Sequence, residues 1–457
     1  MPQPMFRFDE EEAHTVDSQS GPPDYEVLEL SDEEFVDQPG PTVLLGTSSA
    51  SHGLHSFHLS ARRKSSVLRR MSVGSILSQQ SHEFTIKSYD TGKFNLEPEP
   101  QAAKVNISEF EPIKALGQGA YGKVILVKRK STGQLFAQKE LKKASVIVNK
   151  QVERTMAERT ILAQISNHPN IVKLFYALHD HEKVYLLLEY IPGGELFRHL
   201  AQRRVFSESV SAFYTAQMAL ALKHLHGLGI VYRDLKPENC LLDSRGFLVL
   251  TDFGLSKESD ETVSDKGFCK SIIGTPEYMA PEVLRGEDYS YGVDWWSLGA
   301  VLFDMITGNP PFTGNSHKAI SDKIIRSKVA YPTYLSAYAK TLLSRLLNKN
   351  PAKRLGDDRW DDFKKERFFR EIHWGKLFDQ DPSIVPPIIP SISNPELAEN
   401  FDEMFTSMKL SSFEEGSNID IHPGPINIQE NTVEYFNGFS YTAKGSFVNA
   451  YMRDHST

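Results

Sequence analysis

The sequence predicts an α+β fold of two lobes, with a small lobe built on an antiparallel β-sheet and a larger, mainly α-helical lobe after it. Between about 110 and 190, apolar residues alternate as in strands ("KVILVKRK", "LFAQKEL", "KVYLLLEY"), and only "QVERTMAERTILAQI" has helical spacing. Beyond Gly193 the pattern is mostly helical, in "SVSAFYTAQMALALKHLHGLG" and "VDWWSLGAVLFDMITG", each ended by glycine. We therefore expect two lobes with a cleft between them.

The composition of the 457-residue chain is that of an ordinary globular protein, with 40% hydrophobic and 24% charged residues. A formal net charge of -8 gives no support to a nucleic-acid partner. Cys240 and Cys269 are too few for a disulfide framework, and the acidic N-terminus does not resemble a signal peptide. No apolar run approaches the roughly 20 residues of a membrane span. We expect a cytoplasmic protein, with the nucleus left open as a second location.

Residues 1–104 are predicted to form a disordered N-terminal regulatory arm. Acids dominate from Asp9 to Asp37 ("DEEE", "DYEVLELSDEEF"), and a stretch rich in Ser, Gly and His follows. Such a segment cannot bury enough apolar surface to offset the entropy lost on ordering. Within "ARRKSSVLRRMSVGS", three serines follow paired arginines and are candidate phosphorylation sites: Ser65, Ser66 and Ser72.

A glycine-rich segment, "LGQGAYGKV", contains Gly117, Gly119 and Gly122. Dinucleotide-binding folds use the same spacing, but they need a helix after the last glycine, whereas "KVILVK" is predicted to be a strand. A glycine loop between antiparallel strands can lie over a polyphosphate with its amides close to the oxygens. Taken alone, the segment could also be a plain glycine hairpin.

Two charged residues of the predicted small lobe indicate a function only when they are considered as a pair. Lys139 in "FAQKEL" and Glu158 in "TMAERTIL" would each, in isolation, be a solvated surface charge. Together they can form a bridge that holds the lysine against phosphate oxygens.

The stretch "VYRDLKPENCLLD", residues 231–243, places charges among apolar residues, and buried charge is costly without a partner or ligand. Asp234 could accept a proton from an attacking hydroxyl, and Lys236 could neutralise a transferred phosphoryl group. Asn239 and, in "TDFG", Asp252 could bind magnesium, which prefers a few hard oxygens plus substrate phosphates. We expect these charges to face ATP, magnesium and a substrate hydroxyl.

From about Phe110 to Phe369 the sequence resembles a eukaryotic protein kinase, because the motifs above and "PEYMAPE" stand in family order. A lysine at position 236 resembles the residue that serine/threonine kinases have there, and Leu255 resembles the large apolar residue of serine-preferring kinases. Tyr232 replaces the usual histidine, as is common in the AGC group. The resemblance implies the bilobal protein kinase fold, with a small lobe at about 110–190 and a large lobe at about 191–369, and ATP and Mg²⁺ as cofactors.

The resemblance also assigns roles residue by residue. The catalytic residues are Asp234, Lys236, Lys139 and Glu158, and the magnesium ligands are Asn239 and Asp252. The ATP-binding residues are Leu116, Gly117, Gln118, Gly119, Ala120, Tyr121, Gly122, Lys123, Val124, Ala137, Lys139, Glu189, Ile191, Glu195, Leu241 and Thr251.

Further segments resemble the AGC group: "GTPEYMAPE", "DWWSLG", "NPAKRLG", "VPPIIP" and "FNGFSY". Within it, "FDMITGNPPFTGNSHKAISDKI" and "ENFDEMFT" are most similar to the ribosomal protein S6 kinase branch. No lipid-binding domain is expected before the catalytic region, which argues against the Akt and conventional protein kinase C branches. The resemblance implies a C-terminal tail at 370–446, before a short end at 447–457. Its hydrophobic motif (Phe436, Phe439 and Tyr441) is expected to fold back beside the helix that carries Glu158.

Three acids, Glu195, Glu238 and Asp304, resemble AGC residues that receive arginines upstream of the target. We therefore expect protein substrates with basic residues before serine or threonine. The family pattern predicts activation by an upstream activation-loop kinase at Ser271 and a hydrophobic-motif kinase at Ser440, with Ser411 or Ser412 the nearest candidate for a turn motif.

Coupling to nutrient-sensing TOR signalling stays open, because Phe8 and Asp9 of the arm are followed only by acids instead of the docking signal of animal S6 kinases. A pseudokinase that binds nucleotide or partners without catalysis is the competing function. A nucleotide-binding metabolic enzyme is disfavoured by the strand after the glycine loop.

Overall fold

The computed structural model describes residues 25–26, 105–118, 122–165, 168–258, 269, 274–410 and 435–444. Most of the N-terminal arm is therefore outside the description, except strand β1 (Tyr25–Glu26). Several predicted site residues also lie outside it: Gly119, Ala120, Tyr121, Ser65, Ser66, Ser72, Ser271, Ser411 and Ser412.

The small lobe is a six-stranded antiparallel sheet in the order β12-β5-β6-β4-β3-β2, so the predicted small β-lobe is confirmed. Its strands are β2 (Phe110–Gln118), β3 (Gly122–Arg129), β4 (Leu135–Lys142), β5 (Leu174–His179), β6 (Lys183–Glu189) and β12 (Tyr441–Thr442). Helices α1 (Lys143–Val148) and α2 (Val152–Gln164) join β4 to β5. The 3₁₀ turn η1 (Ile107–Glu109) precedes β2.

Alternating burial makes the sheet two-sided. In β4, Phe136, Gln138 and Glu140 are buried, while the residues between them are partly exposed on the other face. Phe136 packs edge-on against Phe110 and Phe175, with ring centroids 5.6 and 5.3 Å away. Because side chains alternate along a strand, Ala137 and Lys139 face the opposite side, toward the rest of the site.

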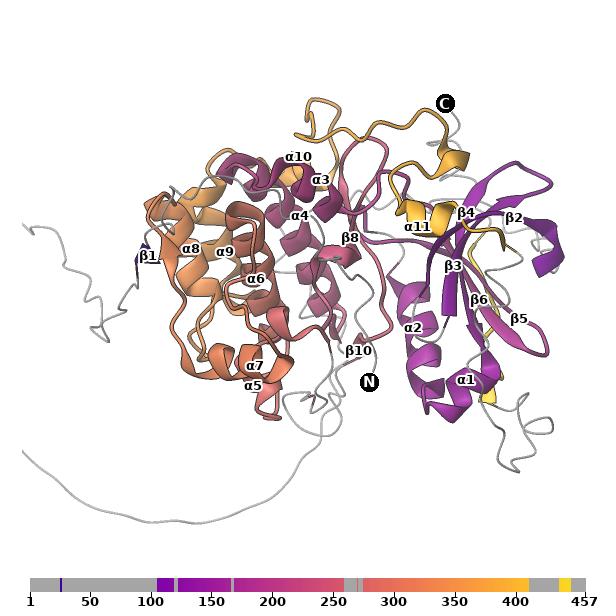
Figure 1. The fold of residues 1–457 in the computed structure, drawn as a ribbon, viewed down its shortest axis with the longest axis horizontal. Coiled ribbons are helices and arrows are strands. Elements are labelled where there is room, and N and C mark those ends of the chain that lie inside the picture. Colours follow the sequence, from indigo (N-terminus) through magenta and orange to yellow (C-terminus); the bar gives the residue numbers. More distant parts are fainter. Residues whose placement is uncertain are drawn as a thin grey trace, which may run out of the picture. The chain divides into compact units, whose positions relative to one another are not determined.

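The large lobe is built around α4 (Glu208–Gly227) and α6 (Gly292–Thr307), whose side chains are buried on nearly every side, as expected for central helices. The surrounding helices are α3 (Leu196–Arg203), α5 (Pro281–Leu284), α7 (His317–Arg326), α8 (Ala337–Leu346), α9 (Trp360–Lys365) and α10 (Trp374–Phe378). Figure 1 shows these helices gathered apart from the sheet of the small lobe, as the sequence predicts. None of the helices in the described residues is long and apolar enough to cross a membrane.

Short strands and 3₁₀ turns place the functional loops of the large lobe. The strands are β7 (Ile230–Val231), β8 (Cys240–Leu242), β9 (Leu248–Leu250), β10 (Lys257–Glu258) and β11 (Tyr331–Pro332). The 3₁₀ turns are η2 (Pro237–Asn239), η3 (Pro276–Tyr278), η4 (Asp357–Arg359) and η5 (Arg367–Phe369). Antiparallel pairing of β7 with β10 and of β8 with β9 sets the loops that follow these strands side by side.

The C-terminal tail passes from the large lobe to the small lobe and includes η6 (Pro395–Leu397) and α11 (Glu403–Thr406). Its backbone approaches the large lobe so closely that a Cβ on Gly194 would lie 2.1 Å from the carbonyl oxygen of Asn400. Since Gly194 also has φ +71°, only glycine suits this contact. On the small lobe, Phe405 joins the apolar cluster around Phe136, and α11 lies beside the sheet (Figure 1).

Candidate active site

Lys139 on β4 connects the sheet to two acids on other elements. Its Nζ lies 2.7 Å from Glu158 Oε1 on α2 and 3.0 Å from Asp252 Oδ1 in the loop after β9. Burial disfavours the charged ammonium, but the two carboxylates outweigh burial and raise the pKa of Lys139 above its usual range. The attraction of Lys139 lowers the pKa of Asp252. The structure therefore forms the predicted Lys139–Glu158 bridge and adds Asp252 to it.

Asp234 lies between β7 and η2 and is 5% exposed. Lys236 Nζ is 3.0 Å from Asp234 Oδ2, and Asn239 Nδ2 donates hydrogen bonds to the same Oδ2 and to the Asp234 carbonyl, each at 2.8 Å. Burial raises the pKa of Asp234 to about 6, a shift that Lys236 opposes and nearby Asp252 reinforces. A carboxyl with a pKa just below neutrality is ionised at pH 7 and can accept a proton from a hydroxyl.

The side-chain oxygens near Asp234 suit a magnesium ion that also binds phosphate oxygens. Thr251 N–H donates to the carbonyl of Asn239 at 3.0 Å, which ties the residue before Asp252 to the backbone of Asn239. Because Asn239 Nδ2 donates to Asp234, its amide oxygen is the atom available to a cation. Within the described ranges, no group of three or more His, Cys, Asp or Glu could hold a metal ion. Magnesium, however, commonly takes only one or two protein oxygens besides phosphates and water.

An apolar cluster between the sheet and the tail holds several residues predicted to bind ATP. Leu116, Val124 and Ala137 gather there with Tyr190 and Phe401. The rings of Tyr190 and Phe401 are stacked, with centroids 5.8 Å apart at an interplanar angle of 22°. A flat apolar surface of this kind suits a purine base. The aromatic residues of the tail, Phe401 among them, are expected from the sequence to dock against the globular part, but the contact of Phe401 with Tyr190 in this cluster could not be predicted from the sequence.

Other predicted ATP residues are placed differently. Lys123 is 6% exposed and lies 3.5 Å from Glu140, whereas Glu189 accepts a hydrogen bond from Lys173 at 2.8 Å. Any contact that Lys123 or Glu189 makes with a nucleotide would therefore come from the backbone. The remaining predicted residues border the cluster or the loops beside it: Gly117 and Gln118 at the end of β2, Gly122 at the start of β3, Ile191, Glu195 bridged to Leu241, and Thr251.

The three acids predicted to bind substrate arginines form one electrostatic group. Burial raises the pKa of Glu195 to about 7, and the charges of Glu238 and Asp402 add to the shift. Burial likewise raises the pKa of Asp304 to about 6, although the Tyr278 hydroxyl donates to Asp304 Oδ2 at 2.7 Å and opposes the shift. Glu238 Oε2 is buried without a hydrogen-bond partner in the described structure. Glu238 thus acts electrostatically on both Glu195 and Asp304, and the nearby Arg198 offsets only part of the effect on Glu195.

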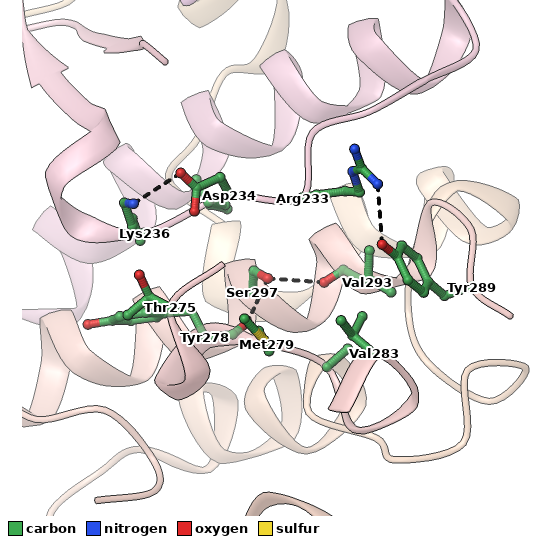
Figure 2. A pocket seen from close by; sticks show the side chains of 12 residues that line it. Arg233, Asp234, Lys236, Thr275, Tyr278, Met279, Val283, Tyr289, Val293 and Ser297 are labelled. Atoms are coloured by element: carbon green, nitrogen blue, oxygen red, sulfur yellow. Dashed lines mark hydrogen bonds and ion pairs between the residues drawn. The ribbon is translucent and has the colours of Figure 1, made fainter. Parts of the chain in front are cut away.

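A pocket adjoins the catalytic loop on the side of the segment 275–280 (Figure 2). Asp234 and Lys236 lie at one edge, where the dashed line joins them, and Arg233 reaches toward the Tyr289 hydroxyl at 3.3 Å on the other. The floor is apolar, and Tyr278 links the pocket to Asp304. The complete lining is Arg233, Asp234, Leu235, Lys236, Thr275, Tyr278, Met279, Ala280, Val283, Tyr289, Val293 and Ser297.

A buried network fixes the catalytic loop, and the sequence reasoning missed it. Asp294 on α6 accepts the backbone N–H groups of Tyr232 and Arg233 at 2.8 and 2.7 Å. His226 on α4 lies between Asp294 (2.8 Å) and Asp357 of η4 (2.5 Å). Arg233 has φ 66°, a conformation unusual for a residue other than glycine, so the acceptor on Asp294 helps to hold a strained backbone next to Asp234.

The hydrophobic motif lies against the small lobe beside α2. Phe436 and Phe439 are fully buried, and Lys143 Nζ is 5.4 Å from the Phe436 ring. Arg159, the neighbour of Glu158, donates from Nε to the Phe439 carbonyl at 2.9 Å and from Nη2 to the Ser440 carbonyl at 2.8 Å. The Arg159 guanidinium also lies over the Tyr441 ring, while the Ser440 side chain is exposed.

Comparison with known proteins agrees with this geometry. Residues 110–369 match the family model of the protein kinase domain. The chain is 44% identical to serine/threonine-protein kinase YPK3 of Saccharomyces cerevisiae over 408 residues, which cover 76% of this chain and 77% of the relative. It is 41% identical to the RAC family serine/threonine-protein kinase homolog of Dictyostelium discoideum over 75% of this chain and 74% of the relative.

For a third relative, the match covers a smaller share of the relative's own length. Ribosomal protein S6 kinase alpha-6 of Homo sapiens is 44% identical over 74% of this chain but only 44% of the relative, so the chain spans less than half of that protein. The chain belongs to the protein kinase family and is a serine/threonine protein kinase of the AGC group, similar to S6 kinases. The predicted family and fold are confirmed, and the family as a whole uses ATP and Mg²⁺.

Proposed function

We propose that this kinase transfers the γ-phosphate of ATP to serine or threonine in proteins with upstream basic residues, as part of growth or nutrient signalling of the TOR type. The observation that carries the proposal is the convergence of two charged groups. The Lys139–Glu158–Asp252 group lies at the sheet, and the Asp234–Lys236–Asn239 group lies in the catalytic loop. A pseudokinase has no need for both groups to be complete.

The residues then divide the reaction among them. Bound MgATP supplies the phosphoryl group to be transferred. Asp234 would orient the substrate hydroxyl and accept its proton, and Lys236, 3.0 Å from Asp234 Oδ2, would offset negative charge on the phosphoryl oxygens. Lys139 would hold phosphate oxygens, kept in place by Glu158. Asn239 and Asp252 would hold magnesium by their side-chain oxygens.

Substrate choice is proposed to depend on Glu195, Glu238 and Asp304. Buried acids near one another raise each other's pKa, and a guanidinium among them would restore their charged forms. Glu238 Oε2 also lacks a hydrogen-bond donor in the described structure, which an arginine side chain would supply. These observations support protein substrates with arginine before the target residue, and the names of the S6 kinase relatives make a ribosomal protein one candidate.

Regulation is proposed to depend on two phosphorylations by upstream kinases, at Ser271 and Ser440. Ser271 lies outside the described residues, so its assignment comes only from the family pattern. At Ser440, the carbonyl already accepts a hydrogen bond from Arg159, and a phosphate on the exposed hydroxyl would add about -1.5 to -2 charge next to this guanidinium. Phosphorylation would then strengthen the docking of Phe436 and Phe439 beside α2. Ser72 is proposed as a further site, and the cytoplasm, with the nucleus left open, as the location.

The decisive experiment is a phosphoryl-transfer assay on an Arg-x-x-Ser peptide with wild type and Asp234→Ala. We expect phosphate incorporation with wild type and a loss of at least about a thousandfold with the variant, because the proton acceptor is gone. Nucleotide binding by a folded wild-type protein without any transfer would establish the pseudokinase instead. Phosphosite mapping of protein from growing and starved cells tests the signalling assignment separately.

A further inference from the structure

A short strand of the N-terminal arm lies on the large lobe. Strand β1, Tyr25–Glu26, pairs antiparallel with β11, Tyr331–Pro332, in a separate two-stranded sheet. Figure 1 shows β1 at the edge of the large lobe. The register sets Tyr25 opposite Pro332 and Glu26 opposite Tyr331. Within the described residues β1 is the only strand that pairs with β11.

The receiving strand combines a fixed side chain with an open backbone edge. The Tyr331 side chain is 4% exposed and packs against Phe303, with ring centroids 6.3 Å apart, so β11 is anchored to the core of the large lobe. An edge strand offers unpaired backbone groups to another strand. Pro332 has no N–H, which limits the length over which a second strand can pair in a regular ladder. This limit agrees with a pairing of two residues.

Exposed aromatic and basic side chains follow β11 along the chain, before and on α8 and around η5. Tyr334 follows the strand and is 61% exposed, and Tyr338 in the first turn of α8 is 38% exposed. Two guanidinium groups lie over the Tyr338 ring, Arg367 at 5.8 Å and Arg370 at 5.6 Å from its centroid. The Arg370 side chain is 60% exposed and pairs only with neighbouring Glu371 among the ion pairs of the described residues. This β11 surface (β11, Tyr334, Tyr338, Arg367 and Arg370) is therefore both apolar and basic.

The sequence around β1 complements the β11 surface. From Asp24 the chain reads "DYEVLEL", in which Tyr25, Val27, Leu28 and Leu30 alternate with or adjoin acids. Tyrosine and valine favour strands, and the acids of this stretch are opposite in charge to the two arginines.

We propose that the β11 surface is a docking site for an acidic, strand-forming segment, and that its occupant in this protein is Asp24–Glu29 of the same chain's N-terminal arm. The segment binds by adding a strand to the edge of β11, with its acids near Arg367 and Arg370. Strand addition of this kind gives affinity through the backbone and selectivity through alternate side chains. The docking concerns a face formed by β11 and α8, and it holds whether or not the catalytic roles assigned above are correct.

A cysteine pair tests the register directly. Tyr25 and Pro332 are opposite each other, and opposed residues of antiparallel strands have Cα atoms about 4.5–5.5 Å apart, which is within the range of a disulfide. We expect the full-length double variant Tyr25→Cys/Pro332→Cys to form an intramolecular disulfide under mild oxidation, seen as a mobility shift and a linked peptide by mass spectrometry. The natural cysteines, Cys240 and Cys269, are buried and should not compete.

The matched control is Ser49→Cys/Pro332→Cys, which places the arm cysteine outside the proposed segment. We expect closure at least about tenfold more slowly in the control. Equal rates in the two variants would overturn the proposal. A disulfide found only between two chains would also overturn it, since the occupant would then be the arm of a second copy.

A second measurement avoids any change in β11. Hydrogen exchange of the segment 328–336 is compared between wild type, Glu26→Pro and the control Gln19→Pro, since proline removes a backbone donor from β1. We expect faster exchange of 328–336 with Glu26→Pro alone, and a drop in the cross-linking rate when Arg367→Gln and Arg370→Gln are combined with the cysteine pair. Unchanged exchange in Glu26→Pro, with α6 equally protected in all samples, would contradict the docking.

Discussion

Lys139 and Glu158 form an ion pair across two elements, with Lys139 Nζ 2.7 Å from Glu158 Oε1, and the glutamate is almost fully buried. The pair fixes the position of α2 relative to β4. Since Asp252 also contacts Lys139, the same ammonium links the small lobe to the loop after β9.

Lys139→Met and Asp252→Ala are expected to abolish phosphoryl transfer while leaving the fold largely intact. Lys139 is proposed to orient phosphates and Asp252 to hold magnesium, so both contributions depend on bound ATP. The measurement is turnover on an Arg-x-x-Ser peptide, with circular dichroism and thermal unfolding as the check on folding. Lys128 on β3 pairs with Glu396 of the tail. Lys128→Met is therefore the control and should stay active. Turnover of either variant within about tenfold of wild type would exclude the assigned role.

Glu238→Ala should raise the Michaelis constant for peptides with arginine three residues before serine. A charge-assisted hydrogen bond contributes about 1.5–3 kcal/mol, so catalytic efficiency should fall by more than about tenfold. A peptide with alanine in place of that arginine is the control, and it should lose little between wild type and variant. If both peptides lose equally, Glu238 acts on something other than the substrate arginine.

The hydrophobic motif predicts a long-range effect on activity. Phe439→Ala removes a fully buried ring, and Ser440→Ala removes the proposed phosphate acceptor. Both variants, and Ser271→Ala, should have lower activity than wild type when purified from cells. Arg159→Lys keeps a charge but lacks the planar fork whose Nε and Nη2 donate separately to the two tail carbonyls, so it should reproduce part of the Phe439→Ala loss. Full activity in all of these variants would refute the regulatory proposal and leave the catalytic one standing.

The buried imidazole of His226 predicts a pH dependence of stability. Burial disfavours its charged form, but hydrogen bonds with Asp294 and Asp357 outweigh burial and raise the pKa of His226 to about 9. Because this pKa lies above the usual value of 6.5, the stabilisation is complete below about pH 6.5 and is lost as the pH rises through 9. The free energy of unfolding should therefore fall between pH 7 and 9.5.

Asp357→Asn isolates this contribution. The amide keeps the shape of the side chain but removes one of the two charges that stabilise the imidazolium, so the decline in stability should move to lower pH. Catalytic turnover should also fall, because His226 and Asp294 position the backbone of Arg233 next to Asp234. Identical stability profiles of wild type and variant from pH 6 to 9.5 would show that His226 does not carry a charge in the folded protein.

The sequence predicted those parts of the site that lie within short motifs. Asp234, Lys236 and Asn239 are neighbours in the chain, and their contacts follow from one loop and one 3₁₀ turn. The Lys139–Glu158 bridge was also predictable, because strand alternation turns Lys139 away from the aromatic core and the family pattern supplies its partner. The two-lobed fold followed from the change in hydrophobic period near residue 190.

Contacts between distant segments could not be predicted in the same way. His226, Asp294 and Asp357 come from α4, α6 and η4, and no spacing in the sequence relates them. Phe401 reaches Tyr190 only because the tail crosses between the lobes. Strand β1 lies in an acidic arm, where composition favours disorder and gives no sign of a pairing with β11. In each case tertiary packing, which composition and periodicity do not encode, decides the contact.

Glu158 and Arg159 are consecutive residues of α2, and each one contacts a different part of the protein. Successive side chains of an α-helix point about 100° apart. Glu158 therefore points to Lys139, while Arg159, the next residue, points to the tail and donates hydrogen bonds to it. A rotation of α2 that weakens the Glu158–Lys139 ion pair must therefore also displace Arg159 from the tail. A compound wedged between α2 and the tail would accordingly change the rate of phosphoryl transfer without competing with ATP, and its effect would disappear in Arg159→Ala.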